Sequence, residues 1–192
     1  MMDNAPTFEC QLCLRHFSGV ANRVCAMALC DCCEQGDISA WLADHGFDIH
    51  YEAWTEVIPS GNSASLYYCQ RIESPIRNKG DTWHGEVTFS REDLGTRISN
   101  FLGFKDLQAG DQLFDDTIFI KTDKENSTTL QALLRTEPFQ HVIMEAVGHR
   151  GSFKIADSQL TLCGASKFQN ELLSELDSIR LAAIALRLIA NA

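Results

Sequence analysis

The amino-acid sequence predicts an α+β protein that begins with a small zinc-binding unit. Six of the eight cysteines lie within the first 33 residues. Further along, short segments that alternate apolar and polar residues are separated by turn residues, which is typical of antiparallel strands. The final stretch has helical periodicity. We therefore expect a zinc knuckle with its following helix at residues 1–46, and an α+β domain at residues 47–192 with a small, mostly antiparallel sheet, flanking helices and a long C-terminal helix.

The cysteine-rich segment contains two Cys-x-x-Cys pairs separated by sixteen residues, a spacing found in structural zinc sites. Each pair bends the backbone so that two thiolates face one point, and two such corners complete the tetrahedron that Zn²⁺ adopts. A segment of helical period follows the second pair, and a helix N-terminus favours anionic sulfur. This order of knuckle and helix is the treble-clef arrangement. The expected ligands of one structural Zn²⁺ are Cys10, Cys13, Cys30 and Cys33.

The same segment resembles FYVE-type and related treble-clef fingers, because the first Cys-x-x-Cys is followed by Phe17-Ser18 and by a later cysteine-rich run. Fingers of this type bind a phosphoinositide through a basic cluster before their middle cysteines. Here that segment, residues 21–25, contains one positive charge, Arg23. The resemblance therefore implies a zinc fold with one zinc ion and does not bring phosphoinositide binding with it.

Other interpretations of the cysteines stay open. Cys25 and Cys32 could bind a second metal ion with one of three histidines. These histidines are His16, His45 and His50. Disulfides are disfavoured, because residues 1–6 show no signal peptide and we expect a reducing cytoplasm. A redox-active pair formed by Cys30 and Cys33 would make the protein a thiol-disulfide oxidoreductase, and a zinc ion with an open coordination position would make it a zinc-dependent enzyme.

The charge distribution argues against nucleic-acid binding. The chain has a formal net charge of -10, and residues 1–50 contain seven acidic residues against Arg15 and Arg23. A phosphate backbone repels such a surface. We also expect no membrane span, because the most apolar run, residues 181–190, is too short to cross a bilayer and is interrupted by Arg187.

The first part of the α+β domain predicts a β-hairpin at residues 49–72, whose strands alternate apolar and polar residues around a turn at residues 59–63. A third strand follows. Its expected apolar residues are Trp83, Val87 and Phe89. Ser90 would then cap a helix that ends at Gly103.

The second part of this domain predicts a strand, two helices and another hairpin. Ile118 and Ile120 mark the strand, Leu130 lies near the start of the first helix, and Pro138 suits the first turn of the second. The hairpin strands would carry Phe153, Ile155, Leu160 and Leu162.

A Gly-Asp-x-x-Phe-Asp motif occupies residues 110–115 and precedes a strand that ends at residues 121–123, a Leu-Leu helix and the final hairpin. In these features, residues 82–163 resemble a domain of unknown function that is common in uncharacterised bacterial proteins. The resemblance implies a bacterial protein and brings no activity, because the family has none assigned.

Residues outside the cysteine-rich segment offer little chemistry. Asp111, Asp115 and Asp116 could gather around a hard cation, but a turn followed by a strand is the simpler interpretation, with Asp115 and Asp116 on opposite faces of that strand. The six histidines are scattered and form no metal-binding or hydrolase motif. Phosphate-binding and dinucleotide-binding fingerprints are also missing from the sequence.

The last segment predicts one helix over residues 167–191 with a heptad stripe of apolar residues. The stripe comprises Leu172, Leu176, Ile179, Ala183, Leu186 and Ala190. Such a helix can lie across the sheet, and part of its apolar face could also form a homodimer.

Together these observations predict a non-enzymatic bacterial protein in which a structural zinc site supports a protein-interaction module. The expected partner is another protein. A thiol-disulfide oxidoreductase or a zinc-dependent enzyme that uses the cysteine-rich segment is the alternative.

Overall fold

A computed structural model of the protein describes residues 47–61, 63–76, 85–91, 107–122 and 127–190, together with the backbone of four short strands near the N-terminus. It divides the chain into two units, residues 1–48 and 49–192. In the first unit, strands pair antiparallel in two hairpins. These are β1 (Thr7–Glu9) with β2 (His16–Ser18), and β3 (Asn22–Val24) with β4 (Met27–Leu29). The four predicted zinc ligands and the helix expected after Cys33 lie outside the described residues.

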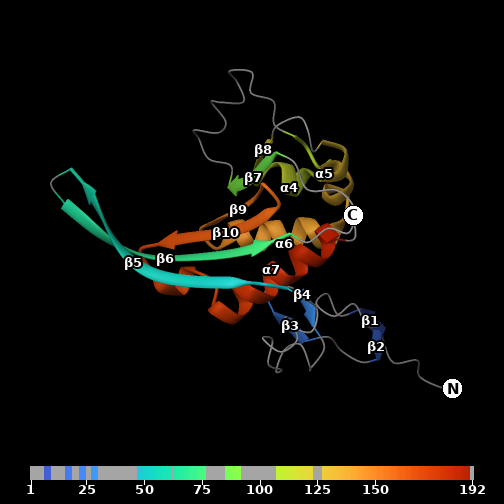
Figure 1. The fold of residues 1–192 in the computed structure, drawn as a ribbon, viewed down its shortest axis with the longest axis horizontal. Helices are drawn as coiled ribbons and strands as arrows, with labels where there is room; N and C mark the ends of the chain where they lie inside the picture. The colour runs from blue at the N-terminus through green and yellow to red at the C-terminus, as the bar shows by residue number, and fades with distance from the viewer. Residues whose placement is uncertain are drawn as a thin grey trace. The chain divides into compact units, whose positions relative to one another are not determined.

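The second unit is built on a six-stranded sheet in which every described pairing is antiparallel (Figure 1). Its strands are β5 (His50–Ser60), β6 (Ser63–Pro75), β7 (Glu86–Arg91), β8 (Ile118–Thr122), β9 (Gly151–Ala156) and β10 (Gln159–Ser166). They lie in the order β5-β6-β10-β9-β7-β8. The α+β class, the predicted hairpin at residues 49–72 and the predicted final hairpin are thereby confirmed.

Two helices cover one face of this sheet (Figure 1). The described helices are α4 (Gln112–Asp115), α5 (Ser127–Leu134), α6 (Glu137–Gly148) and α7 (Glu175–Ala190). α6 packs against β7 and β9, whereas α7 packs against β6 and β10. Pro138 lies in the first turn of α6, as predicted, because proline needs no backbone donor there.

The core of the second unit lies between the sheet and these two helices. Phe89, Phe139 and Phe153 are fully buried and meet edge to face, with ring centroids 5.6 to 6.2 Å apart. This arrangement suits the quadrupoles of the rings and joins β7, β9 and α6. Val87 and Phe89 are both buried, so the third predicted strand is confirmed for these two residues. Trp83 lies outside the described residues.

Two predicted helix boundaries were wrong. Ser90 does not cap a helix, because it lies within β7 and pairs with Phe119 of β8; the rest of the predicted helix lies outside the described residues. The C-terminal helix begins at Glu175 and not at residue 167. Ser174 explains the start, since its hydroxyl accepts a hydrogen bond from the backbone N–H of Asp177 at 3.1 Å and so caps the first turn.

Most of the apolar face of α7 is used inside the second unit. Residues 180–186 and Ile189 are buried. Among the predicted stripe, Ala183 and Leu186 lie in this core, whereas Leu176 is 39% exposed. The helix laid across the sheet is therefore observed, and the homodimer stays a prediction.

Candidate interaction surface

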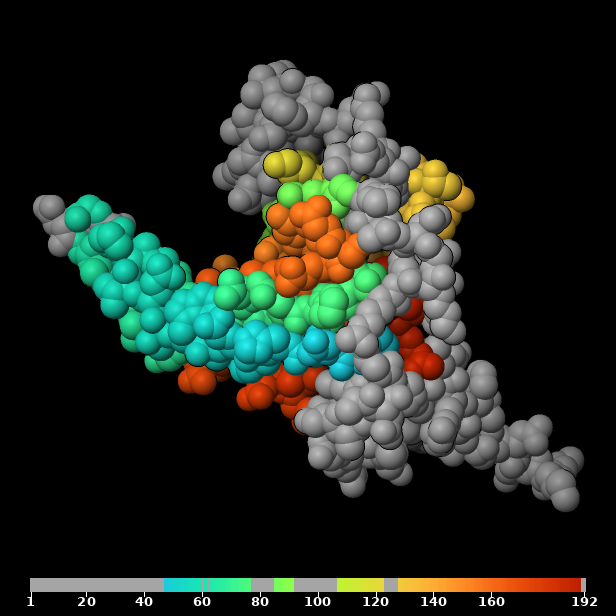
Figure 2. Space-filling view, in the orientation of Figure 1, coloured from blue at the N-terminus to red at the C-terminus, as the bar shows by residue number. Residues whose placement is uncertain are grey.

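The distal half of the β5–β6 hairpin extends beyond the rest of the sheet. Strand β10 pairs with β6 only from Tyr68 to Pro75, so residues 56–60 and 63–67 pair only with each other within the described chain. We call these two segments the arm. Figures 1 and 2 show the arm as a curved projection past the ends of β9 and β10.

The arm exposes large apolar side chains. Val57 is 61% exposed, its cross-strand partner Leu66 is 48% exposed, and Ile58 is 40% exposed. A two-stranded ribbon is only marginally stable in water by itself. Apolar side chains gathered on such a ribbon are typical of a surface that contacts another molecule.

Strand β5 lies at an edge of the sheet, and β6 is the only described strand that pairs with it. The hairpin closes at the pair Ser60 and Ser63 across a two-residue connection, in which Gly61 has φ +59°. Glycine adopts this left-handed conformation without strain. A closing pair of this kind is hydrogen-bonded, so the even-numbered residues of β5 direct their backbone groups toward β6. The odd-numbered residues, from Tyr51 to Val57, therefore direct theirs toward the free edge.

A groove runs along the helix-covered side of β5 and opens to solvent. It has a volume of about 810 Å³. Its lining combines residues of β5 and β6 with residues of the segment that leads into α7. The lining includes Tyr51, Ala53, Tyr68, Leu172, Leu173 and Glu175. Burial and the nearby Glu175 carboxylate raise the pKa of the Tyr51 hydroxyl, which keeps it protonated as a donor at the groove wall.

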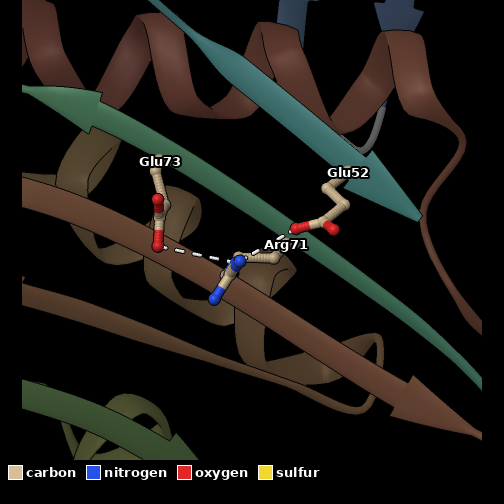
Figure 3. Close-up of polar contacts among 3 residues, drawn as sticks. All are labelled: Glu52, Arg71 and Glu73. Atoms are coloured by element: carbon tan, nitrogen blue, oxygen red, sulfur yellow. Dashed lines mark hydrogen bonds and ion pairs between the residues drawn. The ribbon is translucent and has the colours of Figure 1, made fainter. Parts of the chain in front are cut away.

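The opposite, open side of β5 carries a charged cluster centred on Arg71 (Figure 3). Arg71 donates to the Glu52 carboxylate at 2.8 Å, lies 3.5 Å from Glu73, and sits over the Trp54 ring at 5.9 Å. The hydrogen bond with Glu52 and the Glu73 charge raise the pKa of Arg71. The guanidinium is therefore already engaged by groups of its own sheet.

The two described free cysteines, Cys69 and Cys163, lie on this open side. Burial raises the pKa of both thiols, and the Glu56 carboxylate adds to the effect at Cys69. A raised thiol pKa lowers the thiolate fraction at neutral pH. Burial thus disfavours the thiolate form of both residues, although the Arg71 charge opposes this effect at Cys163.

The aspartates of the Gly-Asp-x-x-Phe-Asp motif have structural roles. Asp111 lies in a turn, as predicted, but the strand predicted at Asp115 and Asp116 is wrong, because these residues end helix α4. Asp111 caps α4 by accepting from the backbone N–H of Phe114 at 2.9 Å. Asp115 accepts from the backbone N–H groups of Ala109 and Gly110, at 2.7 and 3.0 Å. Both carboxylates thus close a turn, and Gly110 has φ +88°, a conformation that favours glycine.

The residues that the structure describes contain no group of three or more metal-binding side chains. Glu145 of α6 lies 3.5 Å from His149, a spacing of one helical turn. Burial raises the pKa of the Glu145 carboxyl, and the two neighbouring histidines oppose this shift. This pair lies at the C-terminal end of α6, and His149 also lines a small cavity with Cys163. No helix in the described ranges is both long and apolar enough to cross a membrane.

The predicted ligands Cys10, Cys13, Cys30 and Cys33, and the second-site candidates Cys25 and Cys32, lie outside the described residues, so the structure does not bring them together or separate them. The arm and its edge were missed in the sequence. Their only signal was the absence of lysine and arginine from residues 47–70, which leaves a strand without the charges that usually protect an edge.

Comparisons with protein-family models, with curated proteins and with solved structures find no match for this chain. The two resemblances noted in the sequence therefore stay predictions.

Proposed function

We propose that this protein is a non-enzymatic interaction module of the bacterial cytoplasm. In this proposal, a structural four-cysteine zinc site shapes the N-terminal unit, and the arm of the second unit contacts a partner protein. The main support for this proposal is the exposure of Val57 and Leu66 on a ribbon that extends beyond the pairing of β6 with β10. Interfaces draw their binding energy from such central apolar side chains once a partner excludes water from them.

The strands of the first unit are compatible with the zinc site. β1 ends one residue before Cys10, and β4 ends one residue before Cys30. β1 and β4 also contact each other. The residues that directly precede the two Cys-x-x-Cys pairs, Glu9 and Leu29, therefore belong to strands that contact each other. Binding of structural zinc contributes on the order of 10 kcal/mol to the folding of small units of this kind.

Metal analysis tests the zinc site. The full-length protein, purified without added metal, should contain about one zinc ion per chain, because four thiolates close the coordination sphere. Cys13→Ser should lose this zinc and unfold the N-terminal unit, whereas the matched control Cys163→Ser, at an exposed position, should retain it. Metal-free protein whose thiols titrate below neutral pH would instead support the alternative, a thiol-disulfide oxidoreductase that uses Cys30 and Cys33.

A paired variant tests the interaction role. Val57→Thr combined with Leu66→Thr keeps strand-forming side chains on the arm and removes its apolar contacts. Proteins captured from the native cells by wild type should be lost with this variant. Leu113→Thr is the control, because Leu113 is 70% exposed but lies on α4. Equal capture by all three proteins would contradict a role for the arm.

The homodimer predicted through the C-terminal helix would have to form through the side chains of α7 that are not buried in the second unit. Leu176 is 39% exposed and is the main apolar side chain left there. Analytical ultracentrifugation of wild type and Leu176→Lys separates this possibility from the arm. A monomer at micromolar concentration for both proteins would exclude the dimer.

A further inference from the structure

The outer edge of β5 has the properties of a strand-acceptor site. Its odd-numbered residues direct backbone N–H and C=O groups away from β6, and no described strand pairs with them. Pro59 lies at the distal end of this series and lacks the N–H donor, so the usable edge runs from Tyr51 to Val57. Edge strands of this length are usually protected by lysine, proline or a bulge. β5 contains no lysine, and no proline before Pro59. It also has no bulge, because its pairing with β6 is continuous.

The two sides of this edge differ in chemistry. On the groove side, Tyr51, Ala53, Leu172 and Leu173 offer apolar surface, next to polar groups of Gln169, Ser174 and Glu175. A strand added to β5 would direct every second side chain into this groove and the alternate ones to the open side of the sheet. Its apolar side chains would therefore belong on the groove side.

Both sides of the edge carry acidic residues, and the open side also has cations. Lys167 lies 5.7 Å from the ring centroid of Tyr67, the cross-strand partner of Glu56. Arg71 already pairs with Glu52 on the open side. Glu56 on the open side and Glu175 at the groove form no ion pair with any described residue. An added strand with lysine or arginine on the open side would place a cation beside Glu56, and cross-strand pairs of opposite charge stabilise a sheet.

We propose that β5 accepts an extended segment of a partner protein, which adds to the sheet as a seventh strand and alternates apolar residues with lysine or arginine. The apolar residues fill the groove beside Leu172 and Leu173, and the cationic residues face Glu56. A second copy of this chain fits less well, because its own β5 would bring Glu52 and Glu56 to the same side of the sheet. This inference rests on the interaction role of the arm and deepens it.

A synthetic peptide provides the direct test on the full-length protein. The probe alternates lysine and valine over about nine residues, a length that spans ~30 Å when extended. Hydrogen exchange followed by NMR should show protection of the Ala53, Thr55 and Val57 amides on binding, with β6 unchanged. A peptide of the same composition with its lysines and valines in separate blocks should not give this protection. Neither should an alternating peptide methylated on the amides of one edge, which would otherwise donate to β5.

Two substitutions test the edge and the charge separately. Thr55→Pro removes a backbone N–H that points away from β6. It should weaken binding of the lysine-valine peptide by about tenfold or more. Glu56→Lys should weaken it by about threefold and should improve binding of an alternating glutamate-valine peptide. Glu137→Lys changes the net charge equally on an exposed part of α6 and should leave both peptides unaffected. The methylated peptide keeps the test decisive if Thr55→Pro does not fold.

The outcomes separate the two proposals. In one outcome, the variant with Val57→Thr and Leu66→Thr loses partner capture, but wild type does not bind the lysine-valine peptide. This result would support the interaction role of the arm and overturn strand addition. Protection of the β5 amides that rises with protein concentration in the absence of peptide would overturn it in favour of pairing between two copies. Retained capture together with absent peptide binding would overturn both proposals.

Discussion

The proximal and distal halves of the β5–β6 hairpin have the same alternating sequence pattern and opposite environments. Ile72 and Leu66 lie on the same strand and on the same face of the sheet, six residues apart. Ile72 is 1% exposed and Leu66 is 48% exposed. The difference is that α7 packs against β6, whereas Leu66 lies on the arm, beyond the residues of β6 that pair with β10. The alternation therefore encodes a strand and its faces, and a third element decides which apolar residues are buried.

The largest expected effect comes from truncating this pair of residues in turn. Ile72→Ala should destabilise the second unit by about 2–5 kcal/mol, because it removes buried methyl groups and leaves a cavity beneath α7. Leu66→Ala should cost less than about 1 kcal/mol, since its side chain is already half in water. Urea denaturation measures both values. Similar losses of unfolding free energy for the two variants would show that Leu66 is as well covered as Ile72. This would contradict the difference between the two halves of the hairpin.

The contrast also explains what the sequence could predict. Both hairpins, the third strand and the first turn of α6 follow from local signals: alternation, the turn at Gly61 and the position of Pro138. Short connections also account for the antiparallel pairing of β5 with β6 and of β9 with β10. The strand order was not predictable, because β7 pairs with β9 across an intervening segment that contains strand β8 and three described helices.

The errors arose where side chains can form hydrogen bonds with backbone groups in more than one local structure. The sequence Ser90-Arg91 resembles a helix cap, but the cross-strand partner of Ser90 on β8 keeps it in the sheet. Asp115 resembles a strand residue after Phe114, yet its carboxylate binds two backbone N–H groups and closes a turn. For the candidate site, acidity and the missing lysines of β5 are visible in the sequence. The free edge and the groove are not, because they depend on which strand lies outermost and where α7 begins.

Glycine substitutions give a second, smaller contrast between the two regions. A Cβ at Gly151 would collide with the carbonyl oxygen of Ala146 and lie 2.8 Å from that of Cys163. Both are backbone atoms, so Gly151→Ala should cost about 1–3 kcal/mol through forced shifts of α6 or β10. A Cβ at Gly61 meets nothing within 4 Å, and Gly61→Ala should cost only about 1 kcal/mol from its left-handed backbone. Thermal unfolding ranks the two variants, and an equal cost would mean that the Gly151 contact relaxes freely.

The smallest effects concern two carboxylates whose pKa values shift in opposite directions. Burial raises the pKa of Glu145 on α6, so the folded state binds its proton more tightly than the unfolded state. Stability from this group is therefore lost as pH rises from 4.5, the unfolded value, through the raised folded pKa. Glu145→Gln should be more stable than wild type at pH 7 by less than about 1 kcal/mol, and the gap should close as pH falls.

Glu86, on the exposed side of the sheet, is a carboxyl group whose pKa shifts in the opposite direction. Its hydrogen bond and ion pair with Lys154, at 2.9 Å, lower the pKa of the Glu86 carboxyl. The stability it contributes is present above 4.5, the unfolded value, and is lost as pH falls through the lowered folded pKa. Glu86→Gln should therefore be slightly less stable than wild type at pH 7, with a gap that also closes on acidification. Urea titrations of both variants between about pH 3 and pH 7 compare the signs. A shift of stability in the same direction for both substitutions at pH 7 would contradict this prediction. It would mean that burial does not raise the pKa of Glu145, and that the covered helix face and the open sheet face do not differ in their effect on these two carboxyl groups.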